Sequence, residues 1–406
     1  MIASLPCLKC FRLLVGALAL LCTALLFTGC DLDGYPQELT YPLRSDPLVV
    51  GHPQQDAPDL DRPGDFPNVL FANLNEEERT KFLLDPAKLK PEQRQELDKA
   101  LTRIFGTPAL PQVEGGNAEV QAMLQTLSST LKLDQATLIS GAGVYRKQCL
   151  HCHGLTGDGR GPTSPWVNPH PRDYRQGVFK FTSSSQGEGE RRPRKEDIER
   201  TIREGILGTS MPSFRLLPDE EIEALASYVI HLSLRGEAEY LVTSFALKGE
   251  IEGDLVEGGN GLGDCLKGIA TYWQNAQQSL IPAEAPPTFK NEEEQQQSIQ
   301  RGFQLFTKQG EAGCISCHTD FGRQAPYKYD YWGTIVRPAD ITTGVLRGGR
   351  RPIDLYYRIH SGINGTGMTA FGKALKPQDI WDLVHFVKAV PYPQMRQKFG
   401  VKLESD

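Results

Sequence analysis

The chain has 406 residues, which is enough for two or three domains, and its formal net charge at pH 7 is −6. A hydrophobic content of 39%, with 40 glycines and 28 prolines, is typical of small, loop-rich domains joined by irregular segments. The acidic balance gives no basic footprint, so nucleic acid is excluded as an expected partner.

Residues 1–29 have the pattern of an export signal. Basic residues precede an uncharged apolar run over 13–27, and Gly29 lies directly before Cys30. This order is typical of a signal peptide. The end of the run resembles the lipobox of bacterial lipoproteins, although Phe27 stands where that motif usually has Leu. The resemblance implies that Cys30 is lipidated and becomes the mature N-terminus. The alternative is an uncleaved membrane anchor, because the run is only slightly short for a span.

Both alternatives place the rest of the chain outside the cytoplasm and on a membrane. Asp31 follows Cys30, which resembles the signal that retains a bacterial lipoprotein at the inner membrane. We therefore expect the chain in the cell envelope, on the periplasmic side of the inner membrane.

Residues 30–133 are predicted to form a tether followed by a small helical region. Residues 31 to about 70 are rich in Pro, Asp and Gly without a sustained period, which favours an extended tether. From Asn75 to Phe105 the pattern is helical: a run of glutamates favours a start, and Gly106 favours an end. A docking element and a solvated spacer both fit these helices.

The pattern Cys-x-x-Cys-His occurs twice and is the attachment motif of c-type haem. The two thiols add across the haem vinyl groups, and the His that follows binds the iron. The alternative is a zinc half-site or a redox dithiol, but a zinc ribbon needs a second Cys pair about 15–20 residues away, and the sequence has none. The predicted attachment and ligand residues are Cys149, Cys152, His153, Cys314, Cys317 and His318.

The segments 134–235 and 292–392 are repeats of one another. Ile202-x-x-Gly205-Ile206-x-Gly208-Thr209-x-Met211 recurs as Ile359-x-x-Gly362-Ile363-x-Gly365-Thr366-x-Met368, and Pro171-x-Asp173 recurs as Pro338-x-Asp340. Such agreement indicates a duplicated domain. We expect a linker over 236–291 between the two domains and a C-terminal tail over 393–406.

Met211 and Met368 are the predicted second ligands of the two irons. A methionine in a loop ordinarily fills a hydrophobic core, but its recurrence at one position of both repeats favours iron ligation. The thioether is a soft donor that favours ferrous iron and so raises the reduction potential.

Each repeat is expected to be helical, without a substantial sheet. Asp134 is a favoured N-cap residue for the first opening helix, and each repeat ends in an amphipathic helix. The opening and closing helices are expected to cross where Gly141 and Gly302 permit close approach. Tyr228 and Phe386 are expected to pack nearby.

The haem motif, with Val144-Tyr145 before it and Met211-Pro212 after it, resembles the class I cytochrome c family. The resemblance implies an all-α fold of two tandem haem domains, each a few helices around one covalently bound haem c with His and Met ligands. In bacteria it also implies haem attachment after export. The second repeat departs from the family pattern, with Thr319 in place of Gly after the His and Thr369 in place of Pro after the Met.

Several further side chains have two interpretations. Three arginines suit haem propionates but are equally typical of a solvated surface: Arg172, Arg337 and Arg351. Three aromatic residues could line a haem edge or fill a core: Trp166, Tyr174 and Trp332. Cys265 lies outside both repeats and is either a free thiol or a replacement iron ligand.

The leading hypothesis is a membrane-tethered di-haem cytochrome that passes electrons from a quinol-oxidising complex to a terminal oxidase or a soluble cytochrome. We expect redox proteins as partners and no substrate of its own. The alternative is a di-haem enzyme of the peroxidase or thiosulfate dehydrogenase type. A haem-based sensor is a third hypothesis, but the sequence contains no output domain.

Overall fold

The computed structural model describes residues 34–51, 74–185, 187, 191–308, 313–399 and 401. The predicted signal, its apolar run and Cys30 lie outside these residues. The described part is all-α, as predicted, with two small two-stranded sheets. Among the helices described, none combines the length and the apolar character that crossing a membrane requires.

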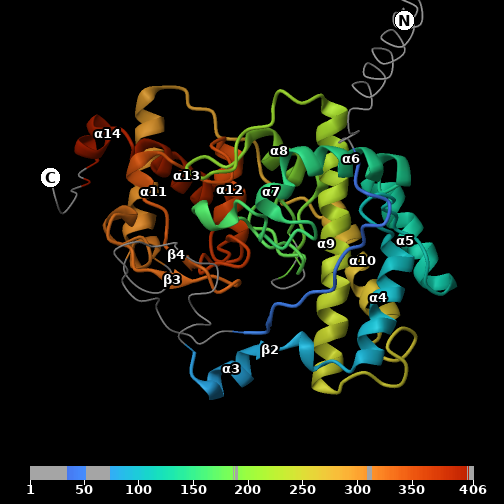
Figure 1. The fold of residues 1–406 in the computed structure, drawn as a ribbon. Helices are drawn as coiled ribbons and strands as arrows, with labels where there is room; N and C mark the ends of the chain where they lie inside the picture. Colours follow the sequence, from blue (N-terminus) through green and yellow to red (C-terminus); the bar gives the residue numbers. More distant parts are fainter. Residues whose placement is uncertain are drawn as a thin grey trace, which may run out of the picture.

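The first domain is organised around one long helix, α9 (Asp219–Lys248), which stands upright in Figure 1. Helices α6 (Gln135–Gln148) and α8 (Lys195–Glu204) pack against it, and the short α7 (Leu150–His153) follows α6 directly. A short 3-10 helix, η2 (Ser164–Trp166), lies in the loop that follows α7. Asp134 caps α6 as predicted, and its carboxylate accepts a hydrogen bond from the Thr137 amide at 3.0 Å.

The predicted helix crossings are confirmed. A Cβ atom at Gly141 would lie 2.1 Å from the carbonyl oxygen of Ala224 and 2.8 Å from Cβ of Tyr228, so α6 can meet α9 only where it has glycine. In the second domain α11 (Glu292–Thr307) crosses α13 (Pro377–Ala389) in the same way. There a Cβ at Gly302 would lie 2.0 Å from the Asp382 carbonyl oxygen and 2.8 Å from Cβ of Phe386.

Residues 34–51 are extended, as expected of a tether, but they pack along the first domain. Tyr41 is only 2% exposed, and its hydroxyl lies 2.9 Å from the hydroxyl of Tyr228. The Tyr240 hydroxyl, on α9, donates to the carbonyl of Val49 at 2.8 Å. Strand β1 (Leu48–Val49) then pairs antiparallel with β2 (Leu83–Leu84), which follows α3 (Glu76–Phe82).

The predicted N-terminal helices dock on the first domain. The predicted start of α3 is confirmed by the capping box that Asn75 forms with Glu78. After η1 (Pro86–Lys88), helix α4 (Pro91–Phe105) packs against α9 and ends at Gly106 as predicted. Helix α5 (Ala118–Leu131) packs against α10 (Leu262–Gln278).

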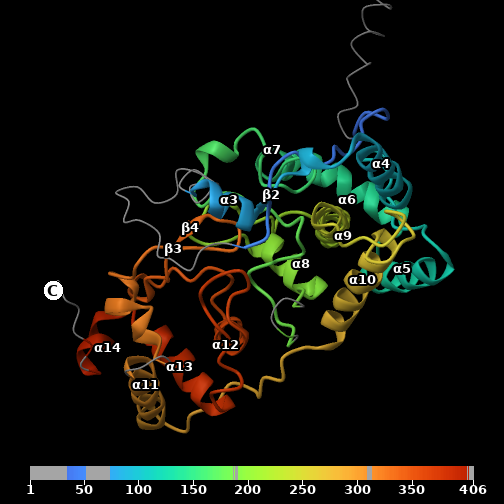
Figure 2. The ribbon, with the colours of Figure 1, turned by 90° about the horizontal axis from the view of Figure 1, so that it is seen from below.

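The structure differs from the expected linker over 236–291. Helix α9 runs on to Lys248, and α10 packs against both α9 and α5. The glycine-rich composition of this stretch hid an apolar helix face, which the structure buries at Leu266, Ile269 and Trp273. The chain passes from the first domain to the second through the residues between α10 and α11, along the lower edge of Figure 2.

The second domain lies beside the first (Figure 2) and carries a β-hairpin that the first lacks among its described residues. Strand β3 (Lys328–Tyr329) pairs antiparallel with β4 (Ile335–Val336). The other elements, in chain order, are η3 (Cys314–Ser316), η4 (Thr319–Gly322), η5 (Ile341–Thr343), α12 (Pro352–Ser361) and α14 (Pro393–Lys398).

The crossing geometry predicts opposite effects for one substitution at two helical glycines. Gly141→Ala forces α6 away from α9 and is expected to destabilise the protein by about 1–3 kcal/mol. Gly268→Ala, in α10, places its Cβ where no atom lies within 4 Å. It is expected to stabilise by about 0.5–1 kcal/mol through helix propensity. Denaturant unfolding measures both, and equal effects would contradict the crossing.

Candidate haem sites

The first attachment motif lies at the junction of α6 and α7. Cys149 ends α6, its amide donating to the carbonyl of Tyr145 at 2.8 Å, and Cys152 lies in α7. Both thiols are free, and Sγ of Cys152 lies 3.2 Å from Oγ1 of Thr163. The helical start of the motif therefore presents two unpaired thiols and the His that follows them in one short turn.

The imidazole of His153 is held by a backbone hydrogen bond. Its Nδ1–H donates to the carbonyl of Arg172 at 3.4 Å, which leaves Nε2 as the nitrogen available to a metal. Burial lowers the pKa of His153 to about 4, so the ring is neutral at physiological pH. A neutral imidazole with one nitrogen anchored is the form that binds iron.

His318 has the same arrangement in the second domain. Its Nδ1–H donates to the carbonyl of Ala339 at 3.0 Å, and burial lowers its pKa. Arg172 and Ala339 are the unspecified residues of the repeated Pro-x-Asp motif. Sequence reasoning found the motif and missed its role, because a carbonyl oxygen is present whatever the side chain.

The two imidazoles have different neighbours. The Tyr174 ring lies 5.6 Å from that of His153, and its hydroxyl lies 2.8 Å from the hydroxyl of Tyr145. Burial raises the pKa of both tyrosines well above its ordinary value, so the phenols stay protonated. In the second domain, by contrast, the Phe306 ring lies 5.9 Å from that of His318 and is stacked on Phe321. This Tyr pair was a second feature that sequence reasoning missed.

The chain reverses at different points after the two histidines. Gly154, with φ of +74°, makes the reversal in the first domain. Thr319 stands at this position in the second, and the left-handed conformations occur later, at Asp320, Phe321 and Gly322. The departure from the family pattern therefore changes the backbone beside the second site, where Cys317 is exposed.

The loops that carry Met211 and Met368 have the same internal hydrogen bonds. The Ile206 amide donates to the Met211 carbonyl at 3.2 Å, and the Ile363 amide donates to the Met368 carbonyl at 3.0 Å. In each loop the Met amide donates to a threonine hydroxyl two residues earlier, at 3.2 Å. Both methionines are half-buried. The repeated motif thus encodes one loop conformation, which holds the methionine at one place in each domain.

The arginines singled out in the sequence contact protein groups. Arg172 pairs with Asp330, Arg351 pairs with Asp354, and the Arg337 guanidinium lies 5.6 Å from the centroid of the Tyr327 ring. Among the aromatic candidates, Trp166 is 80% exposed, whereas Tyr174 and Trp332 are buried.

Cys265 lies in the hydrophobic core that α10 shares with the first domain. Its thiol points to the carbonyl of Asn260 at 3.6 Å, and burial raises its pKa to about 12. A thiol that remains protonated and is packed in a core lacks the thiolate that iron ligation requires.

The two domains are joined by a buried carboxylate. Asp330, on the hairpin of the second domain, has no side-chain exposure and pairs with Arg172 and Lys180 of the first, both at 3.1 Å. Burial alone would raise the pKa of Asp330, but Arg172 and Lys180 outweigh it, and the pKa lies below its ordinary value. Two cations on one domain thus stabilise one anion on the other.

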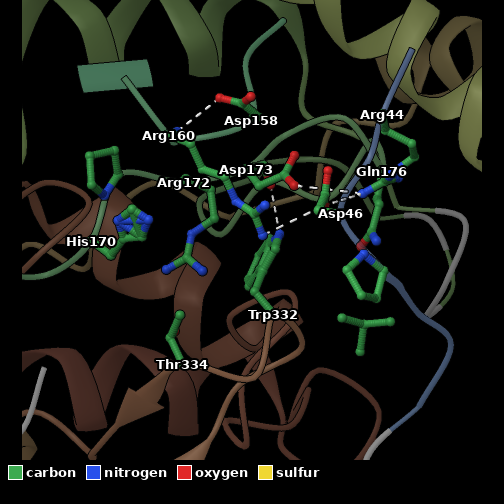
Figure 3. Close-up of a pocket in the computed structure, with 13 residues that line it drawn as sticks. Arg44, Asp46, Asp158, Arg160, His170, Arg172, Asp173, Gln176, Trp332 and Thr334 are labelled. Carbon is green, nitrogen blue, oxygen red and sulfur yellow. Dashed lines mark hydrogen bonds and ion pairs between the residues drawn. The ribbon is translucent and has the colours of Figure 1, made fainter. Parts of the chain in front are cut away.

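A small polar cavity lies at this junction (Figure 3). Its volume is about 40 Å³, which is enough room for a water molecule. Four parts of the chain line it: the N-terminal segment with Arg44 and Asp46, the loop with Asp158 and Arg160, the segment around Arg172, and the hairpin with Trp332.

These residues fit covalently bound haem. Each motif offers two thiols three residues apart, and neither is engaged in a disulfide. Each also offers a His whose pKa is lowered and whose Nδ1 is anchored. This donor set is the one that c-type haem attachment uses.

Comparison with protein families supports the same conclusion. Residues 136–229 match the family model of cytochrome c oxidase, cbb3-type, subunit III, and residues 299–391 match that of cytochrome c. No curated protein matches. Among solved structures, the chain is similar to one from the Kuenenia stuttgartiensis reducing HAO-like protein complex Kustc0457/Kustc0458. The two are 27% identical over 62% of this chain and 96% of that chain, with a TM-score of 0.46.

The fold and the two sites define an electron-transfer protein of the c-type cytochrome class. More particularly, the chain is a tandem di-haem cytochrome of the class I type, with two covalently bound haem c groups.

The buried carboxylate at the domain junction predicts a large effect of one isosteric substitution. Asp330→Asn leaves Arg172 and Lys180 without their anion and is expected to destabilise the protein by about 3 kcal/mol. This is the lower end of the usual range, because the two cationic side chains keep 21% and 19% exposure. Asp219→Asn, at a carboxylate that is 80% exposed, is the control and should change stability by less than about 1 kcal/mol.

The same ion pairs have a defined pH dependence. Since the folded-state pKa of Asp330 is lowered, its stabilisation is present above the unfolded-state pKa of about 4 and is lost as the pH falls through the folded value. Denaturant unfolding at several pH values should therefore show a smaller acid dependence in Asp330→Asn than in the wild type. An unchanged acid dependence would contradict the assignment.

Proposed function

We propose that this protein is a membrane-tethered carrier or subunit that passes electrons between a quinol-oxidising complex and a terminal oxidase or soluble cytochrome. The observation that carries the proposal is the equivalence of the two sites. Each has an anchored neutral His and a Met loop of one conformation, as expected of two irons that exchange electrons without binding a substrate.

In this proposal the thiols of each motif would hold the haem, and one His and one Met of each domain would hold its iron. Cys149 and Cys152 hold the first haem, and Cys314 and Cys317 the second. His153 and Met211 would hold the iron in the first domain, and His318 and Met368 would hold it in the second. The haem iron supplies the one-electron chemistry. The residues of the chain fix its ligands, so little rearrangement accompanies oxidation and reduction.

The burial of Cys265 further supports an electron carrier over a thiosulfate-oxidising enzyme. An enzyme of this type would need a cysteine as an iron ligand. Outside the two haem motifs and the first 30 residues, the sequence has one cysteine, Cys265. That thiol is packed in the first-domain core with its pKa raised to about 12. Steady-state assays with thiosulfate and with peroxide test the enzyme directly. Turnover that depends on Cys265 would overturn this reading.

Substitution of the loop methionines tests the ligand assignment. Met211→Ala and Met368→Ala are each expected to convert one haem from low to high spin and to lower its midpoint potential. Axial ligands move haem potentials over a span of roughly 0.8 V. Met123→Ala and Met395→Ala are the matched controls, because these methionines lie outside the two repeated loops and pack against the two hydrophobic cores. Absorption spectra with redox titration measure both effects. Low-spin spectra in a loop variant would contradict ligation by that methionine.

A lipid at Cys30 would hold the first domain close to the bilayer. Tyr35 is already buried against the protein, and the five residue steps from it to Cys30 span at most about 18 Å. The N-terminal segment therefore works as a short strap whose far end is packed along α9.

Membrane fractionation tests this anchor. Cys30→Ser is expected to release the holoprotein from the membrane fraction or to leave its signal uncleaved, which the mass of the mature chain distinguishes. Cys22→Ser, within the apolar run, is the control and should leave both the location and the mass of the mature chain unchanged, because the signal that contains it is removed. A Cys30→Ser protein that is processed normally and stays on the membrane would contradict lipidation.

A further inference from the structure

Trp332 lies between the two haem sites. It is in the turn of the β3–β4 hairpin of the second domain and is 8% exposed. Its Nε1–H donates to the carbonyl of Asp173, in the first domain, at 2.6 Å. The guanidinium of Arg172 lies over its ring, 3.8 Å from the centroid (Figure 3). The indole is therefore held against the first domain by a hydrogen bond and a cation–π contact.

These contacts lead directly to His153, the proposed iron ligand of the first site. Arg172 supplies the carbonyl that accepts from Nδ1–H of His153, and Asp173 is the next residue. A continuous connection thus runs from the imidazole through one hydrogen bond, the backbone of two residues and a second hydrogen bond to the indole.

The other edge of the indole faces the methionine loop of the second site. A Cβ atom at Gly365 would lie 2.7 Å from Cζ3 of Trp332, and φ of Gly365 is +72°. The Tyr331 amide also donates to the carbonyl of Gly365 at 2.9 Å. Gly365 is three residues before Met368, so Trp332 is packed directly on the loop that presents this ligand.

We propose that Trp332 couples the two haem sites and that electrons pass between them along His153, Arg172, Asp173, Trp332 and the Met368 loop. One electron leaves the ferrous haem of one domain and reduces the ferric haem of the other. The indole is neither oxidised nor deprotonated, and no bond is made or broken. The proposal rests on the proposed function, because it takes His153 and Met368 as iron ligands.

A second contact between the domains offers a rival connection. Val345 of the second domain lies against Gly208, in the Met211 loop, where a Cβ would lie 2.6 Å from its Cγ1. Val345 is 40% exposed, however, and this is a van der Waals contact at the surface. The Trp332 connection has two hydrogen bonds up to a buried ring, which packs on Gly365, and the adjoining Tyr331 amide adds a hydrogen bond to the Gly365 carbonyl. Electron tunnelling is faster through bonded and hydrogen-bonded paths than across van der Waals gaps, so the connection with more hydrogen bonds is favoured.

The test is the rate at which an electron equilibrates between the two haems of the holoprotein after photoreduction by an attached ruthenium complex. Trp332→Phe keeps a ring against Gly365 but removes the Nε1–H hydrogen bond, and Trp332→Ala removes both. We expect a several-fold slower equilibration in Trp332→Phe and a slower one still in Trp332→Ala. Midpoint potentials and low-spin spectra should stay unchanged, which shows that the ligands are intact.

Two variants control for the other ways in which the rate could fall. Arg200→Ala removes an interdomain ion pair to Asp354, at 3.2 Å, that lies outside the proposed path. Val345→Ala trims the rival contact. Both should equilibrate at the wild-type rate. Small-angle scattering shows whether the domains stay docked. If Trp332→Ala separates them, the equilibration rate in Trp332→Phe alone tests the role of Trp332.

The outcomes separate this proposal from the proposed function. A wild-type rate in docked Trp332→Phe and Trp332→Ala, or an equal loss in Arg200→Ala or Val345→Ala, would overturn the role of Trp332 while leaving the electron carrier intact. High-spin haem in the wild-type spectrum would instead overturn the His and Met ligation, before any rate is compared.

Discussion

Each haem site depends on the close contact of two helices at one glycine. Where α6 crosses α9, Gly141 lies so near the backbone of Ala224 that no other residue fits, and Gly302 does the same between α11 and α13. In the first domain this crossing fixes the last turn of α6, and the haem motif begins at the next residue, Cys149. Since α9 and α13 directly follow the methionine loops, the same contacts also position the end of each loop.

A second constraint turns two such domains into one unit. Asp330 is fully buried between Arg172 and Lys180 and also accepts hydrogen bonds from the amides of Trp332 and Thr334. One carboxylate therefore shapes the hairpin and docks it on the first domain. Since Arg172 also anchors His153 through its carbonyl, the junction of the domains and the first haem site share a residue.

The N-terminal segment extends this unit toward the membrane in our proposal. It packs along α9 through Tyr41 and Val49 and contributes Asp46 to the ion pairs of Arg175, at 2.9 Å. The three arginines around Asp46 outweigh the effect of its burial, and its pKa is lowered well below its ordinary value. A segment held this firmly restricts how the first domain can turn relative to an anchor at Cys30.

The parts of the fold that could be predicted from the sequence are those whose residues recur in both repeats. The duplication showed that Gly141 is equivalent to Gly302 and Met211 to Met368, so the role predicted for a residue in one repeat was supported by its counterpart in the other. The features that could not be predicted either occur in one repeat alone or are made by backbone groups. The hairpin of Asp330 and Trp332 has no counterpart among the described residues of the first repeat, and the carbonyls of Arg172 and Ala339 leave no trace in residue type. The length of α9 was missed because Gly236, which suggests a loop by composition, lies where the helix packs on Arg175.

The central claim is that one His and one Met of the chain occupy the two remaining coordination positions of each haem iron. Exposure of the reduced holoprotein to carbon monoxide tests it most directly, because this ligand binds ferrous haem that has an open or weakly held position. The account predicts no change in the absorption spectrum at neutral pH. Rapid binding of carbon monoxide to either haem would contradict it and would show a site open to substrates.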